Sequence, residues 1–377
     1  MTRLVRPAAL PAVLVVAAAT AAAEPMFLSR QHARCGSCHY SPTGGGLLTD
    51  YGRALSHAEL STTGDRSAAG PEAGSRGEEA FLWGALGGAL GPVRLGVDLR
   101  PAHLDVRADS FHETRTFMMS AAFQAAFRAG GWTVYADAGR QGREDGAEYA
   151  SYEHWVERAT EKGLAVRVGR FLPAYGVRFA DHTSFNRRSL GLDTDDQIYG
   201  AELRLAGARH LVQVAVGPGR AEALLDEEDE GAWTASARGQ WDLGGRAVLV
   251  GSALYRGETA LEPQSGSAGL AVGFAPASRL SVWTEADAQW REGTSGAPAW
   301  IVVNETAFEA VRGLWLKLTP QLLTEAGDTS AGVVRLGLAV DFLPRTHWNV
   351  GLSFYRDRER RSGLVTKTLL AQLHLYL

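Results

Sequence analysis

Five consecutive residues near the start of the chain, Cys35-Gly36-Ser37-Cys38-His39, carry the clearest signature of cofactor chemistry. In a Cys-x-x-Cys-His sequence each thiol can form a thioether with one vinyl group of a haem, and the histidine is placed to ligate the iron. The chain has 377 residues, and its only two cysteines lie in this motif. We therefore predict one covalent haem c, attached at Cys35 and Cys38, with His39 as the proximal axial ligand.

Two other uses of such a cysteine pair are a redox disulfide and a zinc site. The disulfide is usually a thioredoxin-type motif on a βαβ unit, and the sequence around Cys35 has no such unit. Zinc would need two further ligands at matching spacing, and the chain has no second cysteine pair. The spacing therefore favours haem attachment.

A second axial ligand must come from the same segment or from whatever surrounds it. His57 is the first choice, because it follows a short predicted helix over residues 47–55 whose apolar face could cover the haem. His32 and Met26 are close enough in sequence to compete, and His182 in a distant loop is a remote candidate. For each of these the alternative is an ordinary residue with no role at iron.

The first 23 residues are typical of an export signal. Arg3 and Arg6 precede a short apolar run, and Ala21-Ala22-Ala23 resembles a cleavage site. The run is too short to span a bilayer. The mature chain would then begin near residue 24, and export fits a haem that bacteria attach after secretion.

Residues 24–60 form the predicted monohaem cytochrome c segment, and residues 61–79 a flexible linker. A segment of this length cannot build a core of its own, so either the haem is most of its core or something else encloses it. The linker is rich in Ser, Thr, Gly, Ala and charge, which is typical of a tether.

Residues 80–377 are predicted to form an all-β, outer-membrane antiparallel β-barrel of about sixteen strands. Segments such as 280–289 and 334–342 alternate apolar and polar residues, which fits a soluble sandwich as well as a barrel. The connections distinguish a barrel from a sandwich, because short and long links alternate as they do in outer-membrane barrels. This alternation places the start of the first strand and the end of the last strand on the short-turn, periplasmic side. Short links fall near 129–131, 160–163, 206–209, 243–246, 275–278, 311–313 and 343–346, and longer polar links near 107–112, 141–148, 174–196, 218–231, 256–265, 291–297, 326–331 and 357–365.

The alternation also predicts a mixed-charge lumen. Such a lumen is ordinary for a water-filled barrel, although arginine forks in it could also meet haem propionates. The longest link, residues 174–196, could fold inward, but a surface loop is favoured. Tryptophans near strand ends fit aromatic girdles, and the acidic run 226–230 fits a solvated loop. The predicted inward residues are Arg167, Glu202, Arg204, Glu285, Asp287, Arg335 and Asp341.

The N-terminal part of the chain resembles a known family at Met26-Phe27, Arg30-Gln31, the Cys-x-x-Cys-His motif, Leu47 and Tyr51-Gly52-Arg53. These residues look like the N-terminal segment of the fused monohaem cytochrome–porins of bacterial outer membranes, best known from ferrous-iron-oxidising cytochromes. The family's Phe-x-Arg-Gln lead-in is interrupted here, and the match covers only about 30 positions. The resemblance implies a haem in or at the mouth of a barrel, bound by Cys35, Cys38 and His39.

The leading prediction is an outer-membrane electron conduit rather than an enzyme. It would pass electrons between periplasmic carriers and an extracellular donor or acceptor such as ferrous iron, within outer-membrane lipid. One alternative is a solute porin with an appended periplasmic haem segment, and another is a haem-based sensor or peroxidase with an open axial position. The net charge of −4 offers no basic patch, so nucleic acid is not an expected partner.

Overall fold

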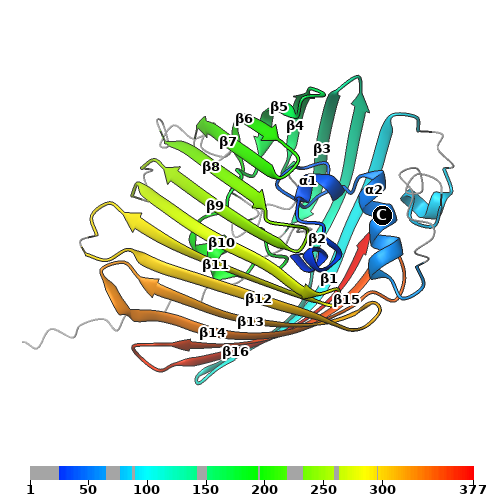
Figure 1. Cartoon of the computed structure of the whole chain (residues 1–377). Coiled ribbons are helices and arrows are strands. Elements are labelled where there is room, and N and C mark those ends of the chain that lie inside the picture. The colour runs from blue at the N-terminus through cyan, green and yellow to red at the C-terminus, as the bar shows by residue number, and fades with distance from the viewer. Residues whose placement is uncertain are drawn as a thin grey trace, which may run out of the picture.

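The computed structural model describes residues 25–64, 77–86, 90–141, 151–193, 196–218, 232–258, 263–294 and 296–377. The predicted export signal and the acidic run 226–230 lie outside the described residues. The strands, shown in Figure 1, are β1 Val93–Ala108, β2 Phe111–Ala129, β3 Trp132–Gln141, β4 His154–Ala159, β5 Leu164–Phe171, β6 Ile198–Ala206, β7 His210–Pro218, β8 Trp233–Asp242, β9 Ala247–Arg256, β10 Ser265–Ala277, β11 Leu280–Arg291, β12 Ala299–Val311, β13 Leu314–Glu325, β14 Asp328–Phe342, β15 Trp348–Glu359 and β16 Val365–Tyr376.

The sixteen strands form one closed antiparallel barrel, in which each strand pairs with its neighbours in sequence. The last strand closes the barrel by pairing with the first, with Asp98 opposite Tyr376 and Arg107 opposite Lys367. Strand β7 illustrates the alternation, because exposed and buried residues succeed one another along most of its length. The predicted fold class and the strand count are confirmed.

The outside of the barrel has the apolar band expected of a surface in lipid. On β8, Trp233 and Trp241 both point outward and lie eight residues apart. At the usual rise and tilt of barrel strands, this spacing corresponds to about 20 Å of bilayer thickness. Exposed aromatic residues continue both girdles, with Trp132, Phe274, Phe308 and Phe342 at one end and Tyr255, Trp290 and Trp300 at the other.

The two rims of the barrel differ in their connections. We call one the short-turn rim; it consists of the links 130–131, 160–163, 207–209, 243–246, 278–279, 312–313 and 343–347. The opposite loop rim carries the longer links, as predicted, with two exceptions at 109–110 and 326–327. These two links are tight turns because the adjoining strands continue as hairpins beyond the apolar band, where polar residues such as His112 and Thr114 are exposed.

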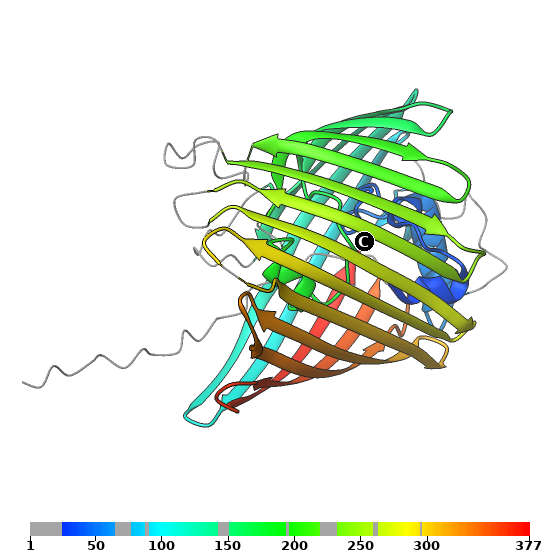
Figure 2. The same cartoon turned by 60° about the vertical axis from the view of Figure 1, so that its left-hand side comes forward.

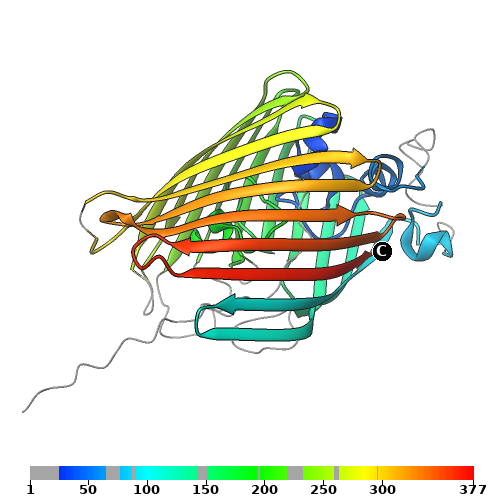
Figure 3. The ribbon, with the colours of Figure 1, turned by 90° about the horizontal axis from the view of Figure 1, so that it is seen from below.

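The N-terminal segment lies in the mouth of the barrel at the short-turn rim (Figures 1 and 3). It consists of η1 Pro25–Arg30, α1 Cys35–Cys38, α2 Asp50–Leu55 and η2 Ser56–Leu60. The predicted helix over residues 47–55 therefore begins at Asp50, with Thr49 as its N-cap. From the sequence, either a haem or another part of the protein could enclose so short a segment. In the structure the barrel wall encloses it.

Both described ends of the predicted linker contact the short-turn rim. The Thr62 amide donates to the Leu343 carbonyl at 3.0 Å, and Arg345 pairs with Glu78 at 3.0 Å. A short 3-10 turn, η5 Phe81–Gly84, follows and leads to the first strand. Residues 65–76 of the linker lie outside the described residues.

The longest link, described over residues 172–193 and 196–197, folds into the lumen (Figure 2) and contains the short helix α3 Phe185–Ser189; we call it the inward link. The expectation that favoured a surface loop is wrong here. The link carries large apolar side chains, among them Phe179 and Leu190, which are each 1% exposed and pack with Trp283 of the wall. Burial of these side chains stabilises the inward position.

Candidate functional site

The Cys-x-x-Cys-His motif forms a single helical turn at the centre of the N-terminal segment. The His39 amide donates to the Cys35 carbonyl at 3.0 Å, and the Tyr40 amide donates to the Leu47 carbonyl at 3.0 Å. Both thiols are free rather than joined in a disulfide. The motif is therefore arranged as a turn that presents two thiols and one imidazole together.

Helix α2 packs directly on this turn. The Thr49 amide donates to the Cys38 carbonyl at 2.8 Å, and the Thr49 hydroxyl accepts from the Gly52 amide at 3.0 Å. Gly52 is required by the packing, because a Cβ at this position would lie 2.2 Å from the Cys38 carbonyl oxygen. This packing explains the glycine in Tyr51-Gly52-Arg53, since any side chain at this position would push α2 away from the Cys-x-x-Cys-His turn.

We expect Gly52→Ala to lower covalent haem incorporation severalfold, because overpacking of this kind typically costs 1–3 kcal/mol and displaces the Cys38 backbone. Haem staining of the purified barrel on a denaturing gel measures this. Gly36→Ala is the matched control, because its Cβ would meet Pro42 at an ordinary 3.5 Å. Equal haem content in the two variants would contradict the packing argument.

Charged pairs fix the segment to the wall around the mouth. Arg94 of β1 donates twice to Asp50, both times at 2.7 Å, and Arg34 pairs with Asp242 of β8 at 2.7 Å. Arg30 pairs with Glu309 at the end of β12. Partly buried bidentate pairs of this kind fix orientation as well as position. These contacts come from three separated parts of the wall, so the segment is held across the opening.

Apolar contacts complete the docking. Leu47, which is 1% exposed, packs in a cluster with Tyr135, Trp155 and Phe171 of the barrel interior. Met26 packs in another with Trp315, which is fully buried. Leu47 and Met26 of the N-terminal segment are therefore buried against the barrel.

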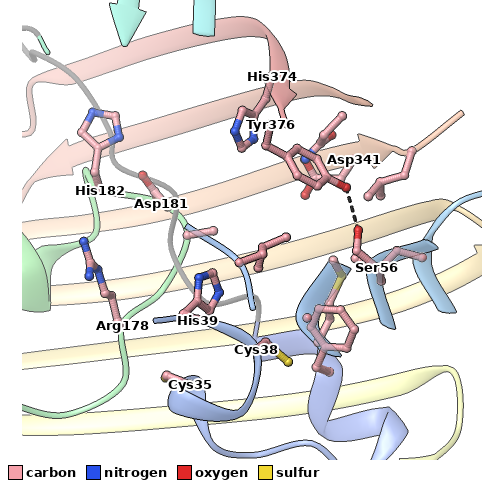
Figure 4. Close-up of a pocket in the computed structure, with 18 of the residues that line it drawn as sticks. Cys35, Cys38, His39, Ser56, Arg178, Asp181, His182, Asp341, His374 and Tyr376 are labelled. Atoms are coloured by element: carbon pink, nitrogen blue, oxygen red, sulfur yellow. Dashed lines mark hydrogen bonds between the residues drawn. The ribbon is translucent and has the colours of Figure 1, made fainter. Parts of the chain in front are cut away.

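A large cavity lies between the motif and the inward link. It holds about 1880 Å³ of space, open solvent included, and Cys35, Cys38 and His39 line one part of it. Arg178, Asp181 and His182 of the inward link also line it (Figure 4). The wall contributes further polar side chains, including Asp98, Arg100, Arg238, Lys317, Asp341 and His374.

The electrostatics of the motif suit a ligand imidazole. Burial and, to a smaller extent, the nearby Arg178 cation lower the pKa of His39 to about 4. His39 is therefore neutral at ordinary pH, which is the form that binds a metal. Burial also raises the pKa of the Cys38 thiol to about 12.

The candidate distal ligands differ in where the structure places them. The ring of His57 is hydrogen-bonded to the Thr346 hydroxyl at 2.5 Å, and His57 is not among the residues that line the cavity. His32 and Met26 line the cavity from the same segment as the motif. His182 lines it from the inward link and is 4% exposed.

The His182 Nε2 atom is the distinctive feature of this set. It is buried and has no hydrogen-bond partner among the described residues. Burial lowers the pKa of His182, so its imidazole is neutral as well. His374, which the sequence analysis did not single out, also lines the cavity, but its Nε2 is already hydrogen-bonded to Asp98 at 3.1 Å.

The inward link holds His182 on several anchors. The neighbouring Thr183 accepts from Arg335 of β14 at 2.9 Å, and Arg335 is itself paired with Asp357 at 2.7 Å. Further along the link, the Tyr175 hydroxyl donates to Asp287 of β11 at 2.8 Å. The position of His182 is thus set by the barrel wall rather than by a free loop.

The predicted inward residues all face the lumen. Arg167 and Glu202 pair at 2.8 Å and are each 1% exposed, and Lys317 pairs with Asp341 at 2.8 Å. Glu285 and Asp287 serve mainly to hold the inward link. Within the described residues, no group of three or more His, Cys, Asp or Glu side chains could hold a metal ion, and no helix is long and apolar enough to cross a membrane.

Solved structures with the same barrel architecture show what the fold is. OprB of Pseudomonas putida at high pH matches with a TM-score of 0.61 and 9% identity over 80% of this chain and 99% of that chain. The fold is that of an outer-membrane porin. OmpT of Vibrio cholerae matches with a TM-score of 0.56 and 9% identity over 76% and 97% of the two chains. An anion-selective porin from Comamonas acidovorans gives 0.55 and 10% over 76% and 99%.

Sequence comparison adds no family. No protein-family model matches the chain, and no curated protein matches it. At this low identity the solved structures establish the porin barrel alone. The porin-like barrel and its lipid-facing surface are therefore established, as predicted.

Proposed function

We propose that this barrel is an outer-membrane electron conduit with one covalent haem c in its mouth. The observation that carries the proposal is that the Cys-x-x-Cys-His turn lies inside the barrel opening and lines the same cavity as the inward link. A periplasmic appendage would leave this motif outside the wall. Fixing it in the lumen instead suits a redox centre that serves both sides of the membrane.

The residues around the cavity fit a haem. Cys35 and Cys38 would hold it by thioethers, His39 would ligate the iron, and the orphaned His182 Nε2 is the favoured distal ligand. When bound, haem supplies a one-electron centre whose potential the axial ligands set. The chain's own part is to position these groups and to exclude water from them.

Arg178 and Arg238 are the cations best placed for haem propionates. Both line the cavity, Arg178 donates to the Gly44 carbonyl, and Arg238 donates to the Gly176 carbonyl at 2.8 Å. Arg238 also donates to the side-chain amide oxygens of Gln213 and Gln240, which are neutral as well. A guanidinium whose hydrogen bonds go to neutral oxygens, as those of Arg238 do, gains from an arriving carboxylate.

A conduit also explains why the lumen is obstructed. The N-terminal segment occupies one mouth, and the inward link occupies the interior. The barrel satisfies backbone hydrogen bonds in lipid, while the inserted segments narrow the water-filled path. The external partner would be an electron donor or acceptor, with ferrous iron as one candidate, and the internal partner a periplasmic carrier.

Reconstitution tests this function directly. The purified barrel is inserted into liposomes that contain oxidised cytochrome c, and dithionite is added outside. We expect reduction of the enclosed cytochrome only with the haem-loaded protein. Absence of haem staining in the heat-shifted barrel band, or equal reduction by a variant that lacks both cysteines, would overturn the conduit.

The second candidate is a solute porin, which the fold comparisons favour because the matched structures include an anion-selective porin. The two functions differ in conductance. In planar bilayers the conduit predicts single-channel conductance well below that of an open sixteen-stranded barrel. Large conductance together with slow electron transfer would favour the porin.

A further inference from the structure

The short-turn rim carries a ring of positive charge. Six of its seven turns contain one basic residue, and Glu161 is the only acidic residue in the seven. By contrast, the sequence 219–232, which joins β7 to β8, contains six acidic residues and one basic residue. The ring consists of Lys162, Arg209, Arg246, Arg279, Arg312 and Arg345; we call it the basic rim.

Four side chains of the basic rim have no hydrogen-bond or ion-pair partner among the described residues. Arg312 donates to the Ser61 carbonyl at 2.9 Å, and Arg345 pairs with Glu78. For the side chains of Lys162, Arg209, Arg246 and Arg279, the described part of the chain supplies neither a hydrogen bond nor an ion pair. Lys162, Arg209 and Arg279 are exposed and Arg246 is half-buried. Arginines on neighbouring turns that have no described anionic partner repel one another, so the rim favours an anionic neighbour.

Arg209, Arg246 and Arg279 lie on turns that contact the N-terminal segment. Arg34 donates to the Gly207 and Ala208 carbonyls at 2.8 and 3.0 Å, next to Arg209. Arg30 donates to the Ser278 carbonyl at 2.6 Å, next to Arg279. A Cβ on Gly245, next to Arg246, would lie 3.2 Å from the Gln31 side chain.

The haem motif is accessible at this opening. Gly36 and Ser37, the two residues between the cysteines, are exposed, and Tyr51 of α2 is 40% exposed. Nearby carboxylates are already paired, Asp242 with Arg34 and Glu309 with Arg30. An approaching partner therefore meets uncompensated positive charge beside the most exposed part of the motif.

We propose that the basic rim is the docking surface for a soluble redox carrier with an acidic face. This rests on the proposed function, because the carrier would exchange electrons with the haem. Complementary charge steers such an encounter and raises its rate by ten-fold to a thousand-fold at low salt. A carrier needs a short-lived complex, and screened charges across a wet surface provide one.

The experiment follows reduction of the purified ferric protein by reduced flavodoxin, an acidic probe, in a stopped-flow instrument. One electron passes from the reduced flavin of the probe to the ferric haem. We expect the triple variant R209E/R246E/R279E to react at least ten-fold more slowly than the unmodified protein at 10 mM salt. At 1 M salt, where the Debye length is about 3 Å, the two rates should converge.

The matched control is R356E/R358E/K367E, which reverses three exposed charges near the loop rim. Its rate should stay within twofold of the unmodified protein. An equal rate for the rim variant, or faster reaction with reduced basic cytochrome c than with flavodoxin, would overturn the proposal. The proposal would also be overturned if the rim variant changed only the protein's preference for phosphatidylglycerol over phosphatidylcholine nanodiscs, because the rim arginines would then be lipid ligands.

A binding measurement separates this proposal from the conduit itself. Sedimentation of flavodoxin with the nanodisc-embedded protein reports docking without electron transfer. Salt-sensitive binding that is lost in the rim variant would support the docking surface even in a protein that proved to contain no haem. Absence of binding together with intact haem staining would reject the docking surface and leave the conduit standing.

Discussion

Replacing both Cys35 and Cys38 by alanine is expected to reduce covalent haem to background while the barrel still folds. The two thiols are the only cysteines in the chain, so no other side chain can form the thioethers. Cys35 and Cys38 are each only partly buried, and the segment is held to the wall by Arg94, Arg34 and Arg30 rather than by the thiols. The measurement is haem staining of the barrel band with and without heating.

Ser37→Ala is the control for this variant, because Ser37 lies inside the motif, is exposed, and its side chain takes no part in attachment. It should retain full staining and the same heat-dependent mobility. Haem that survived removal of both cysteines would show non-covalent binding. A barrel without staining in the unmodified protein would refute haem attachment altogether.

The parts of the fold that sequence could predict are those set by local periodicity. Alternation within each strand and the rhythm of its turns depend on residues a few positions apart, so the sixteen strands and the inward charges such as Arg167 and Glu285 were accessible. The Cys-x-x-Cys-His turn was accessible for the same reason. Its five residues are consecutive, and their chemistry depends on that spacing.

The parts that sequence could not predict depend on how the barrel closes. Arg209, Arg246 and Arg279 lie more than thirty residues apart and each is an ordinary turn residue. Only the closed sheet brings them to one rim, which is why the sequence showed no basic patch. The tight turns at 109–110 and 326–327 likewise belong to strands that extend beyond the apolar band. The polar ends of these strands resemble loops in the sequence.

The inward link was missed for a related reason. A long polar link is usually external, and this general tendency favours a surface loop even though the link contains the aromatic residues Tyr175, Phe179 and Phe185. Their spacing alone does not say which wall would cover them. In hindsight the signal was their number, because several large apolar side chains in one link require burial somewhere.

The choice of the histidine at iron also depended on closeness in sequence. His57 follows the motif closely in sequence, yet its ring is hydrogen-bonded to Thr346 at the rim. His182 is remote in sequence, yet it shares a cavity with His39 and has a buried, unpartnered Nε2. We therefore expect His182→Ala to convert the haem from a six-coordinate low-spin species to a mainly five-coordinate high-spin one, because the iron would lose its distal ligand.

Visible absorption and electron paramagnetic resonance of the ferric protein measure this change, with His57→Ala as the matched control. His57→Ala should leave the spectrum unchanged, since the ring is engaged outside the cavity. Added imidazole should restore the low-spin spectrum of His182→Ala by filling the vacated position, which a merely structural effect would not allow. An unchanged spectrum in His182→Ala would remove it as ligand and leave His32 and Met26, the cavity-lining candidates of the N-terminal segment, to be tested in the same way.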